Sequence, residues 1–171
     1  MYWFHHYANA EEGNSVIDKL ISNLFKDETK AFLTWIRLHN IDDPFGGSQT
    51  WHRPVSEMPA PLYYAAMLGL GFVVNSILPI NAGGSDSSET VNAQGGRLGN
   101  ALQAASYKGH EKIVKLLLSR GADINTQVGM YAIALQAASY RGHEKVVQML
   151  LIEAPILILR VDAMAMRSRP H

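Results

Sequence analysis

The chain of 171 residues contains no cysteine. Without thiols it cannot form disulfides, use a cysteine nucleophile or hold a metal through thiolates. The absence of disulfides is typical of proteins in reducing compartments. The N-terminal stretch MYWFHHYANAEEG has no basic region followed by an apolar segment, as a secretory signal would have. We therefore expect an intracellular, cytoplasmic protein.

Long apolar runs and an excess of one charge are also missing. The longest apolar runs, Ala65–Val74 and Pro155–Leu159, fall well short of the ~20 residues that cross a bilayer. Lys and Arg together number 15, as do Asp and Glu, so the formal net charge is zero. A neutral chain lacks the basic footprint of a nucleic-acid-binding protein and has no general attraction to an anionic membrane surface. We expect neither partner.

The most informative feature that is present is an internal repeat. Residues 101–118 read ALQAASYKGHEKIVKLLL and residues 134–151 read ALQAASYRGHEKVVQMLL, with 14 of 18 positions identical at an offset of 33 residues. Similarity at a fixed period is the signature of stacked repeats, in which each unit buries its apolar face against a neighbour. Stacking produces an extended surface rather than a closed catalytic pocket.

Each copy predicts two helices joined by a tight turn. Alanines in the first segment allow a neighbouring helix to approach closely, and Gly109 stands where a left-handed residue would end that helix. Glu111 follows in the first turn of the second helix, where a carboxylate is favoured. We interpret the apolar runs Leu116–Leu118 and Met149–Leu151 as core. A weaker third copy lies upstream, within Pro61–Leu78.

This unit, with G-H at the turn and LLLSRGADIN at its end, resembles the ankyrin repeat. The resemblance implies an all-α solenoid of helix–turn–helix units with connecting hairpin loops. The first element departs from the family's T-P-L-H, because Asn100–Gln103 and Ile133–Gln136 stand in its place. The family's Thr–His hydrogen bond between repeats is therefore absent. Asn100 and Gln103 could supply a substitute, whereas Ile133 cannot.

The repeat register divides the chain into five parts. They are an N-terminal helical region with an irregular linker (1–58), a repeat with a loop insertion (59–99), a regular repeat (100–132), an incomplete repeat (133–155) and a non-repeat tail (156–171). Residues 14–40 predict two helices, which form either a degenerate repeat or a capping pair. Because nothing after Glu153 continues the pattern, we interpret the array as truncated or as ending in an altered gene product.

Longer strings extend the resemblance. AFLTWIRLHNIDDPF, SEMPAPLYYAAMLGL and the variant element NALQAASYKGH are similar to the ankyrin region of fungal NACHT-type receptors. In that family an effector and a nucleotide-binding module precede the repeats, which are thought to sense a ligand. No G-x-x-x-x-G-K-[ST] string occurs in this chain. The resemblance thus implies only the recognition part of a larger receptor.

Few groups could carry catalysis or hold a metal. His5–His6 has no evident third ligand, and Asp27–Glu28 and Asp42–Asp43 are adjacent carboxylates rather than a pair facing across a cleft. His110 and His143 recur at one repeat position, which predicts turn histidines bonded to the backbone. We expect no enzyme, cofactor or metal site.

A glycine-rich segment lies between two of the repeats. Gly95–Gly99 lacks the spacing of a dinucleotide-binding loop and aligns with the hairpin between repeats, so we interpret it as a hairpin.

Tyr107 and Tyr140 occupy equivalent positions, followed by Lys108 and Arg141, and predict a ladder of aromatic and cationic pairs. Some of these rings could instead fill the groove between repeats.

The resemblance also ranks surface residues. Ankyrin arrays usually meet protein partners at the hairpin tips and the end of the first helix, on the concave side, and Tyr and Arg are favoured binding anchors. The matching positions are Gln94, Arg97, Leu98, Tyr107, Lys108, Gln127, Met130, Tyr131, Tyr140 and Arg141. We expect non-catalytic binding of a protein partner there. The alternatives are a structural or autoinhibitory segment, or a gene fragment without independent function.

Overall fold

The computed structural model describes residues 15–26, 58–78 and 89–153, together with Phe32, Thr34, Ile36 and Ile41. The main helices of the described residues are α2 (Ser15–Lys26), α4 (Pro61–Leu68), α5 (Gly71–Ile77), α7 (Ala101–Lys108), α8 (Glu111–Ser119), α9 (Ala134–Arg141) and α10 (Glu144–Glu153). Several expectations fall outside the described residues, namely those for His5–His6, Asp27–Glu28, Asp42–Asp43, most of the insertion within Pro79–Thr90, and the tail 156–171.

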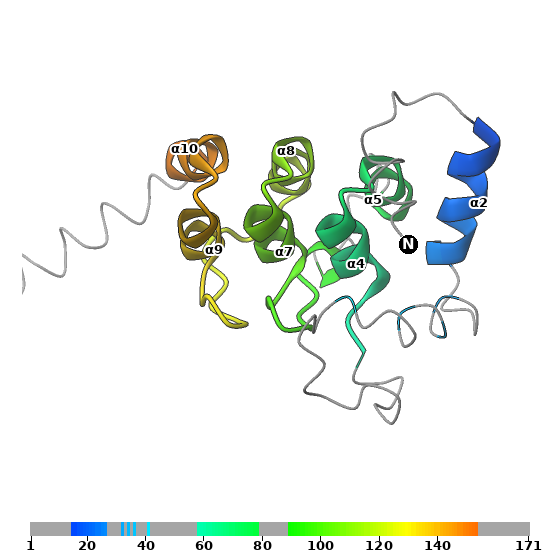
Figure 1. Cartoon of the computed structure of the whole chain (residues 1–171), viewed down its shortest axis with the longest axis horizontal. Coiled ribbons are helices and arrows are strands. Elements are labelled where there is room, and N and C mark those ends of the chain that lie inside the picture. Colours follow the sequence, from blue (N-terminus) through cyan, green and yellow to red (C-terminus); the bar gives the residue numbers. More distant parts are fainter. Residues whose placement is uncertain are drawn as a thin grey trace, which may run out of the picture.

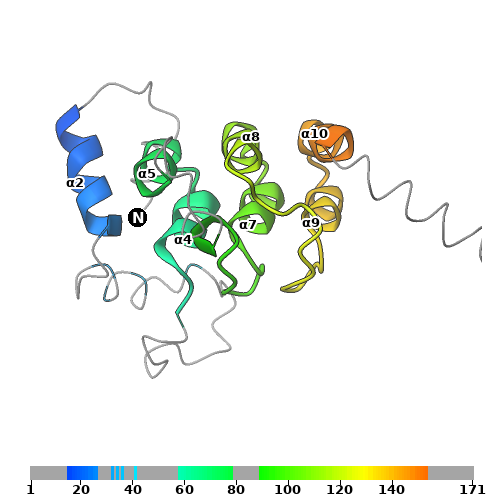
Figure 2. The same ribbon diagram turned by 180° about the vertical axis from the view of Figure 1, so that it is seen from behind.

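The helices form two parallel rows. Helices α4, α7 and α9 lie side by side in an inner row, and α5, α8 and α10 lie beside one another in an outer row (Figure 1). Figure 2 shows the same order from behind, with the hairpin loops leaving the inner row on the side away from the outer row. Each inner helix packs on its own outer helix and on the next inner helix. This is the all-α stack of helix–turn–helix units that the repeat predicts.

Small side chains let the inner helices pack closely. An alanine pair lies in each inner helix, and all six of these alanines are 0% exposed; they are Ala65, Ala66, Ala104, Ala105, Ala137 and Ala138. A helix of eight residues is not stable alone in water, so neighbouring helices must supply its stability. The outer helix α8 is amphipathic instead, burying Ile113, Val114 and Leu117 while its lysines face solvent.

The last described outer helix departs from the expected core. Leu150 is 1% exposed and Met149 is half-buried, but Leu151 is 46% exposed and its neighbour Ile152 is 75% exposed. The prediction that Leu151 is core is therefore wrong. Its counterpart Leu118 is half-buried because α8 packs against α10, whereas no further described helix packs beside α10.

Helix α2 covers the N-terminal end of the stack. It packs against α5 and α4 and buries Ile21 and Phe25. The Phe25 and Phe32 rings lie 4.9 Å apart, and Phe32 meets Tyr64 of α4 edge-on at 6.0 Å. Burial of large aromatic rings is a main source of packing energy. These contacts give the first repeat an apolar neighbour on its otherwise open side.

The Gly95–Gly99 segment is a hairpin, as predicted. The Gly95 amide donates to the Gly99 carbonyl at 2.7 Å, and Gln94 and Asn100 form a short antiparallel bridge. The hydroxyl of buried Tyr63 accepts a hydrogen bond from the Leu98 amide at 3.2 Å and ties the loop to the first repeat. The next hairpin stacks on this one, because the Met130 amide donates to the Arg97 carbonyl at 3.0 Å.

Gln103 replaces the missing Thr–His contact. The side-chain oxygen of Asn100 accepts a hydrogen bond from the backbone N–H of Gln103 at 2.9 Å and caps α7. The two N–H groups of Gln103 Nε2 are shared among three carbonyls of the following hairpin, those of Thr126 at 3.3 Å, Val128 at 2.9 Å and Ala132 at 2.6 Å. Ile133 has no side-chain cap on α9, as expected. The buried Gln103 thus links one repeat to the loop of the next.

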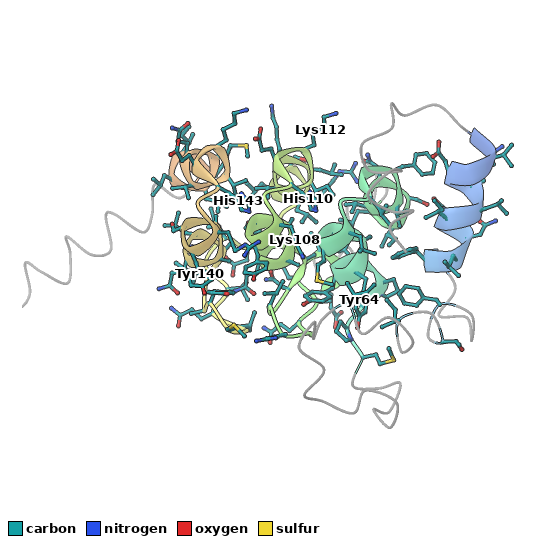
Figure 3. The ribbon with its side chains drawn as sticks, in the orientation of Figure 1. Tyr64, Lys108, His110, Lys112, Tyr140 and His143 are labelled. Carbon is teal, nitrogen blue, oxygen red and sulfur yellow. The ribbon has the colours of Figure 1, made fainter. Side chains whose placement is uncertain are left out.

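The recurring histidines form a second link between repeats. His110 Nε2 lies 3.2 Å from the Met67 carbonyl, and His143 Nε2 lies 3.0 Å from the Tyr107 carbonyl. Since a carbonyl can only accept, each ring nitrogen is the donor. Figure 3 places both rings at the level between the two rows. The prediction of backbone-bonded turn histidines is confirmed, and each bond reaches the preceding repeat.

The Gln103 link should contribute measurably to stability. We predict that Gln103→Ala lowers the free energy of unfolding by about 1 to 2 kcal/mol, because partly buried hairpin carbonyls lose their donor. The loss stays moderate because the buried Oε1 of Gln103 has no partner of its own in the described structure. Urea titration followed by circular dichroism measures it.

The repeat supplies a matched control for that experiment. Gln136 is the equivalent residue of α9 and is exposed, so Gln136→Ala should change stability by less than about 0.5 kcal/mol. Equal effects of the two substitutions would show that the contact between repeats contributes nothing.

The histidine link gives a second matched pair. Gly109 has φ +75°, and a Cβ there would lie 2.6 Å from the His143 ring, whereas Gly142 has φ +72° and nothing within 4 Å. Gly142→Ala should cost about 1 to 2 kcal/mol, the strain of an alanine in the left-handed region. Gly109→Ala should cost clearly more, since it also displaces His143. Thermal and urea unfolding compare the two, and identical losses would refute the steric role of the histidine.

Candidate protein-binding surface

The surface in question is the hairpin face, which we define as the inner-row helices together with the loops 93–100 and 126–133. Most residues ranked from the sequence are accessible on it. Gln94, Arg97, Gln127 and Met130 are exposed on the two hairpins. Lys108, Tyr140 and Arg141 are exposed at the ends of α7 and α9, and Tyr107 and Tyr131 are half-buried.

Leu98 is the exception and corrects the sequence ranking. Its side chain is only 6% exposed and belongs to the hydrophobic core. The hydrogen bond from the Leu98 amide to the Tyr63 hydroxyl holds this part of the loop against the first repeat. Leu98 therefore anchors its hairpin to the core and is not available on the surface.

Three tyrosines from α7, α9 and the hairpin between them meet on this face. The Tyr107 and Tyr131 rings are stacked, with centroids 5.3 Å apart and planes 27° apart. Tyr131 in turn lies 5.0 Å from Tyr140. We call Tyr107, Tyr131 and Tyr140 the tyrosine cluster. The sequence predicted that Tyr107 and Tyr140 belong to one ladder. In the structure Tyr131 of the hairpin lies between their rings.

Two cations flank the cluster. The Arg141 guanidinium lies 4.9 Å from the centroid of the Tyr107 ring, and the Lys108 ammonium lies 5.9 Å from the same centroid. Both distances are within the range of cation–π attraction. Arg141 belongs to α9 and Tyr107 to α7, so this contact joins two repeats. The sequence paired Arg141 with Tyr140, whereas in the structure both cations lie over the Tyr107 ring.

The cluster is part groove filling and part exposed surface. Tyr107 and Tyr131 pack against the core, while Tyr140 is 70% exposed and Met130 is 50% exposed. Burial raises the pKa of Tyr131, and a hydrogen bond and charge interaction with Tyr107 act in the same direction. The charge of Tyr140 also raises that pKa, whereas Arg141 lowers it. The tyrosines and Arg141 are therefore electrostatically connected.

Comparison with known proteins agrees with this architecture. A family profile described as "Ankyrin repeats (3 copies)" matches residues 62–160. The chain belongs to the ankyrin-repeat family. It is also similar to a protein named "Azaphilone pigments biosynthesis cluster protein L" from Monascus ruber, with 46% identity over 125 residues. That match covers 72% of this chain and 26% of the relative, so the chain spans about a quarter of the relative's length.

Other candidate sites do not gain support within the described ankyrin repeats. No three side chains of His, Asp or Glu gather there closely enough to hold a metal ion. His110 and His143 are engaged between repeats, and Gly95–Gly99 closes a hairpin against Tyr63. None of the described helices is both long and apolar enough to cross a membrane. The tyrosine cluster is thus the strongest candidate site of this part of the chain.

The link between Arg141 and Tyr131 can be tested by titration. A guanidinium stabilises the tyrosinate anion, so Arg141→Gln should raise the pKa of Tyr131 further above its ordinary value. Carbon-13 NMR of the tyrosine Cζ atoms follows this ionisation directly. Lys112→Gln on α8 is the control and should leave it unchanged.

The sign of the shift also fixes a dependence of stability on pH. The folded state holds the Tyr131 proton more tightly than the unfolded state. The resulting contribution to the free energy of unfolding is complete below the ordinary tyrosine pKa, about 10, and is lost as pH rises through the higher pKa of the folded state. A Tyr131 pKa that falls in Arg141→Gln would contradict the assigned contact.

Proposed function

We propose that this ankyrin-repeat chain is a non-catalytic module that binds another protein through its hairpin face. The observation that carries the proposal is the tyrosine cluster flanked by Lys108 and Arg141. Tyrosine and arginine provide large contact area at low entropic cost and are enriched among binding hot spots. Such a group, partly exposed between α7 and α9, is suited to anchoring a partner.

The non-catalytic part of the proposal rests on what the polar groups do. The two recurring histidines donate to backbone carbonyls of the preceding repeat, and the buried Gln103 donates to the next hairpin. These groups maintain the stack. General acid–base catalysis is most often carried by His, Asp or Glu, and the described hairpin face contains none of these residues.

We further propose that the module acts within a larger protein. The relative from Monascus ruber is about four times as long as the matched region, because that region is 26% of it. Its name refers to a pigment biosynthesis cluster and says nothing of a receptor. Membership of a NACHT-type receptor therefore stays a prediction that rests on the sequence resemblance.

The binding proposal is tested with Tyr140→Ala/Arg141→Ala. Both side chains are exposed, so the variant should keep its fold, whereas truncating Tyr107 would also remove core packing. We predict that affinity capture from an extract of the source organism, quantified by mass spectrometry, shows at least about tenfold loss of the specific partner. Circular dichroism confirms the fold.

The matched control is Lys112→Ala/Lys115→Ala, which truncates two exposed side chains of α8 in the outer row. It should retain the partner. If both variants retain it, the hairpin face is not the binding surface. If instead no external partner is found and Tyr140→Ala/Arg141→Ala weakens a contact within a longer protein, the module is structural or autoinhibitory.

A further inference from the structure

Charge is distributed unevenly between the two rows. The inner-row segments 93–108 and 126–141 contain three cations, Arg97, Lys108 and Arg141, and no Asp or Glu. The outer-row segments 109–125 and 142–153 carry four cations and four carboxylates. The chain is neutral as a whole, so its hairpin face is positive because of where the charges lie.

Two of these cations have no carboxylate partner in the described structure. Lys108 and Arg141 both lie over the Tyr107 ring, and neither forms an ion pair with a described Asp or Glu. In the outer row, by contrast, Lys145 pairs with Glu111 at 3.6 Å. Two like charges near one ring repel each other, and a carboxylate that binds either of them would offset that repulsion.

The surroundings of the cations are apolar and aromatic. Tyr140 is 70% exposed and Met130 is 50% exposed next to the half-buried Tyr131. A ligand of this surface therefore gains from burying apolar side chains as well as from meeting charge. A protein segment that alternates apolar and acidic residues offers both features.

Nucleic acid fits the face less well. Its affinity comes mainly from many phosphate contacts made by basic residues, and such proteins carry a strong net positive charge. The hairpin face has three cations, and the complete chain has a formal net charge of zero. The observations therefore favour a partner with a few carboxylates over a polyanion.

We propose that the hairpin face selects an acidic protein segment, whose carboxylates bind Lys108 and Arg141 and whose apolar side chains cover the tyrosine cluster. This assignment rests on the proposed function and adds the chemical class of the partner. The contacts are solvent-exposed, so their effect is screened by salt. The preference for acidic over neutral protein segments should consequently be strongest at low ionic strength.

Synthetic peptides test the assignment. Three short fluorescein-labelled peptides share leucines at alternate positions and carry glutamate, glutamine or lysine between them. In fluorescence anisotropy the glutamate peptide should bind the full chain about tenfold more tightly than the glutamine peptide, and the lysine peptide more weakly still. Raising the salt concentration should reduce the difference between them.

A charge-matched pair of variants locates the site. Lys108→Gln/Arg141→Gln should weaken binding of the glutamate peptide about tenfold. Lys112→Gln/Lys115→Gln removes the same charge from α8, and Figure 3 shows Lys112 pointing away from Lys108 and Tyr140. That control should change binding less than about twofold. All side chains changed are exposed, so both variants should fold, which circular dichroism checks.

Several results would overturn the assignment. They are equal binding of the glutamate and glutamine peptides, equal weakening by the two variants, and no binding of any peptide. Tighter binding of a single-stranded oligonucleotide, lost in Lys108→Gln/Arg141→Gln, would assign the face to nucleic acid instead. If the chain nevertheless retains a captured protein that depends on Tyr140 and Arg141, the proposed function stands and only the acidic class of the partner is wrong.

Discussion

The close approach of the inner helices is the constraint on which the rest of the structure depends. Helices α4, α7 and α9 pack side by side, and each contains a completely buried alanine pair, so these small side chains permit a short distance between repeats. At that distance the Gln103 side chain can reach the next hairpin, and the His143 ring can reach the preceding repeat. A larger side chain at an alanine would separate the helices and break both links, because well-packed interiors tolerate little extra volume.

The same spacing produces the candidate binding surface. Tyr107 and Tyr140 are equivalent residues of neighbouring repeats, and the gap between their rings admits one further aromatic ring. Tyr131 fills it from the intervening hairpin, whose position is fixed by Gln103. Arg141 then reaches back over the Tyr107 ring. The surface is therefore a direct consequence of repeat packing, and a change in a buried contact could alter binding without touching an exposed residue.

Much of the fold could be predicted from the sequence because the pattern of the two-helix unit occurs in two nearly identical copies, 101–118 and 134–151. The glycines that follow α7 and α9, and the histidine after each glycine, have fixed backbone roles, so their positions alone indicated the turn. Residues whose burial or stacking depends on a contact with another repeat were harder to predict. Leu98 lies in a polar, glycine-rich loop but is buried, because Tyr63, 35 residues earlier, holds its amide. Tyr131 could be ranked as accessible, but its stacking between two helices depends on the hairpin path, which local sequence does not specify.

The comparison of identical segments shows why sequence identity between repeats does not give equal roles. Gln103 and Gln136 occupy the same position in ALQAASY, but one is buried under the next hairpin and the other is exposed. Tyr107 packs against the core beneath Arg141, whereas Tyr140 is largely exposed. The difference comes from the neighbour, since each repeat acquires its buried surface from the unit stacked on it. A residue repeated in both copies can thus maintain the stack in one repeat and be exposed in the other, so that one repeated segment supplies both stability and a candidate binding surface.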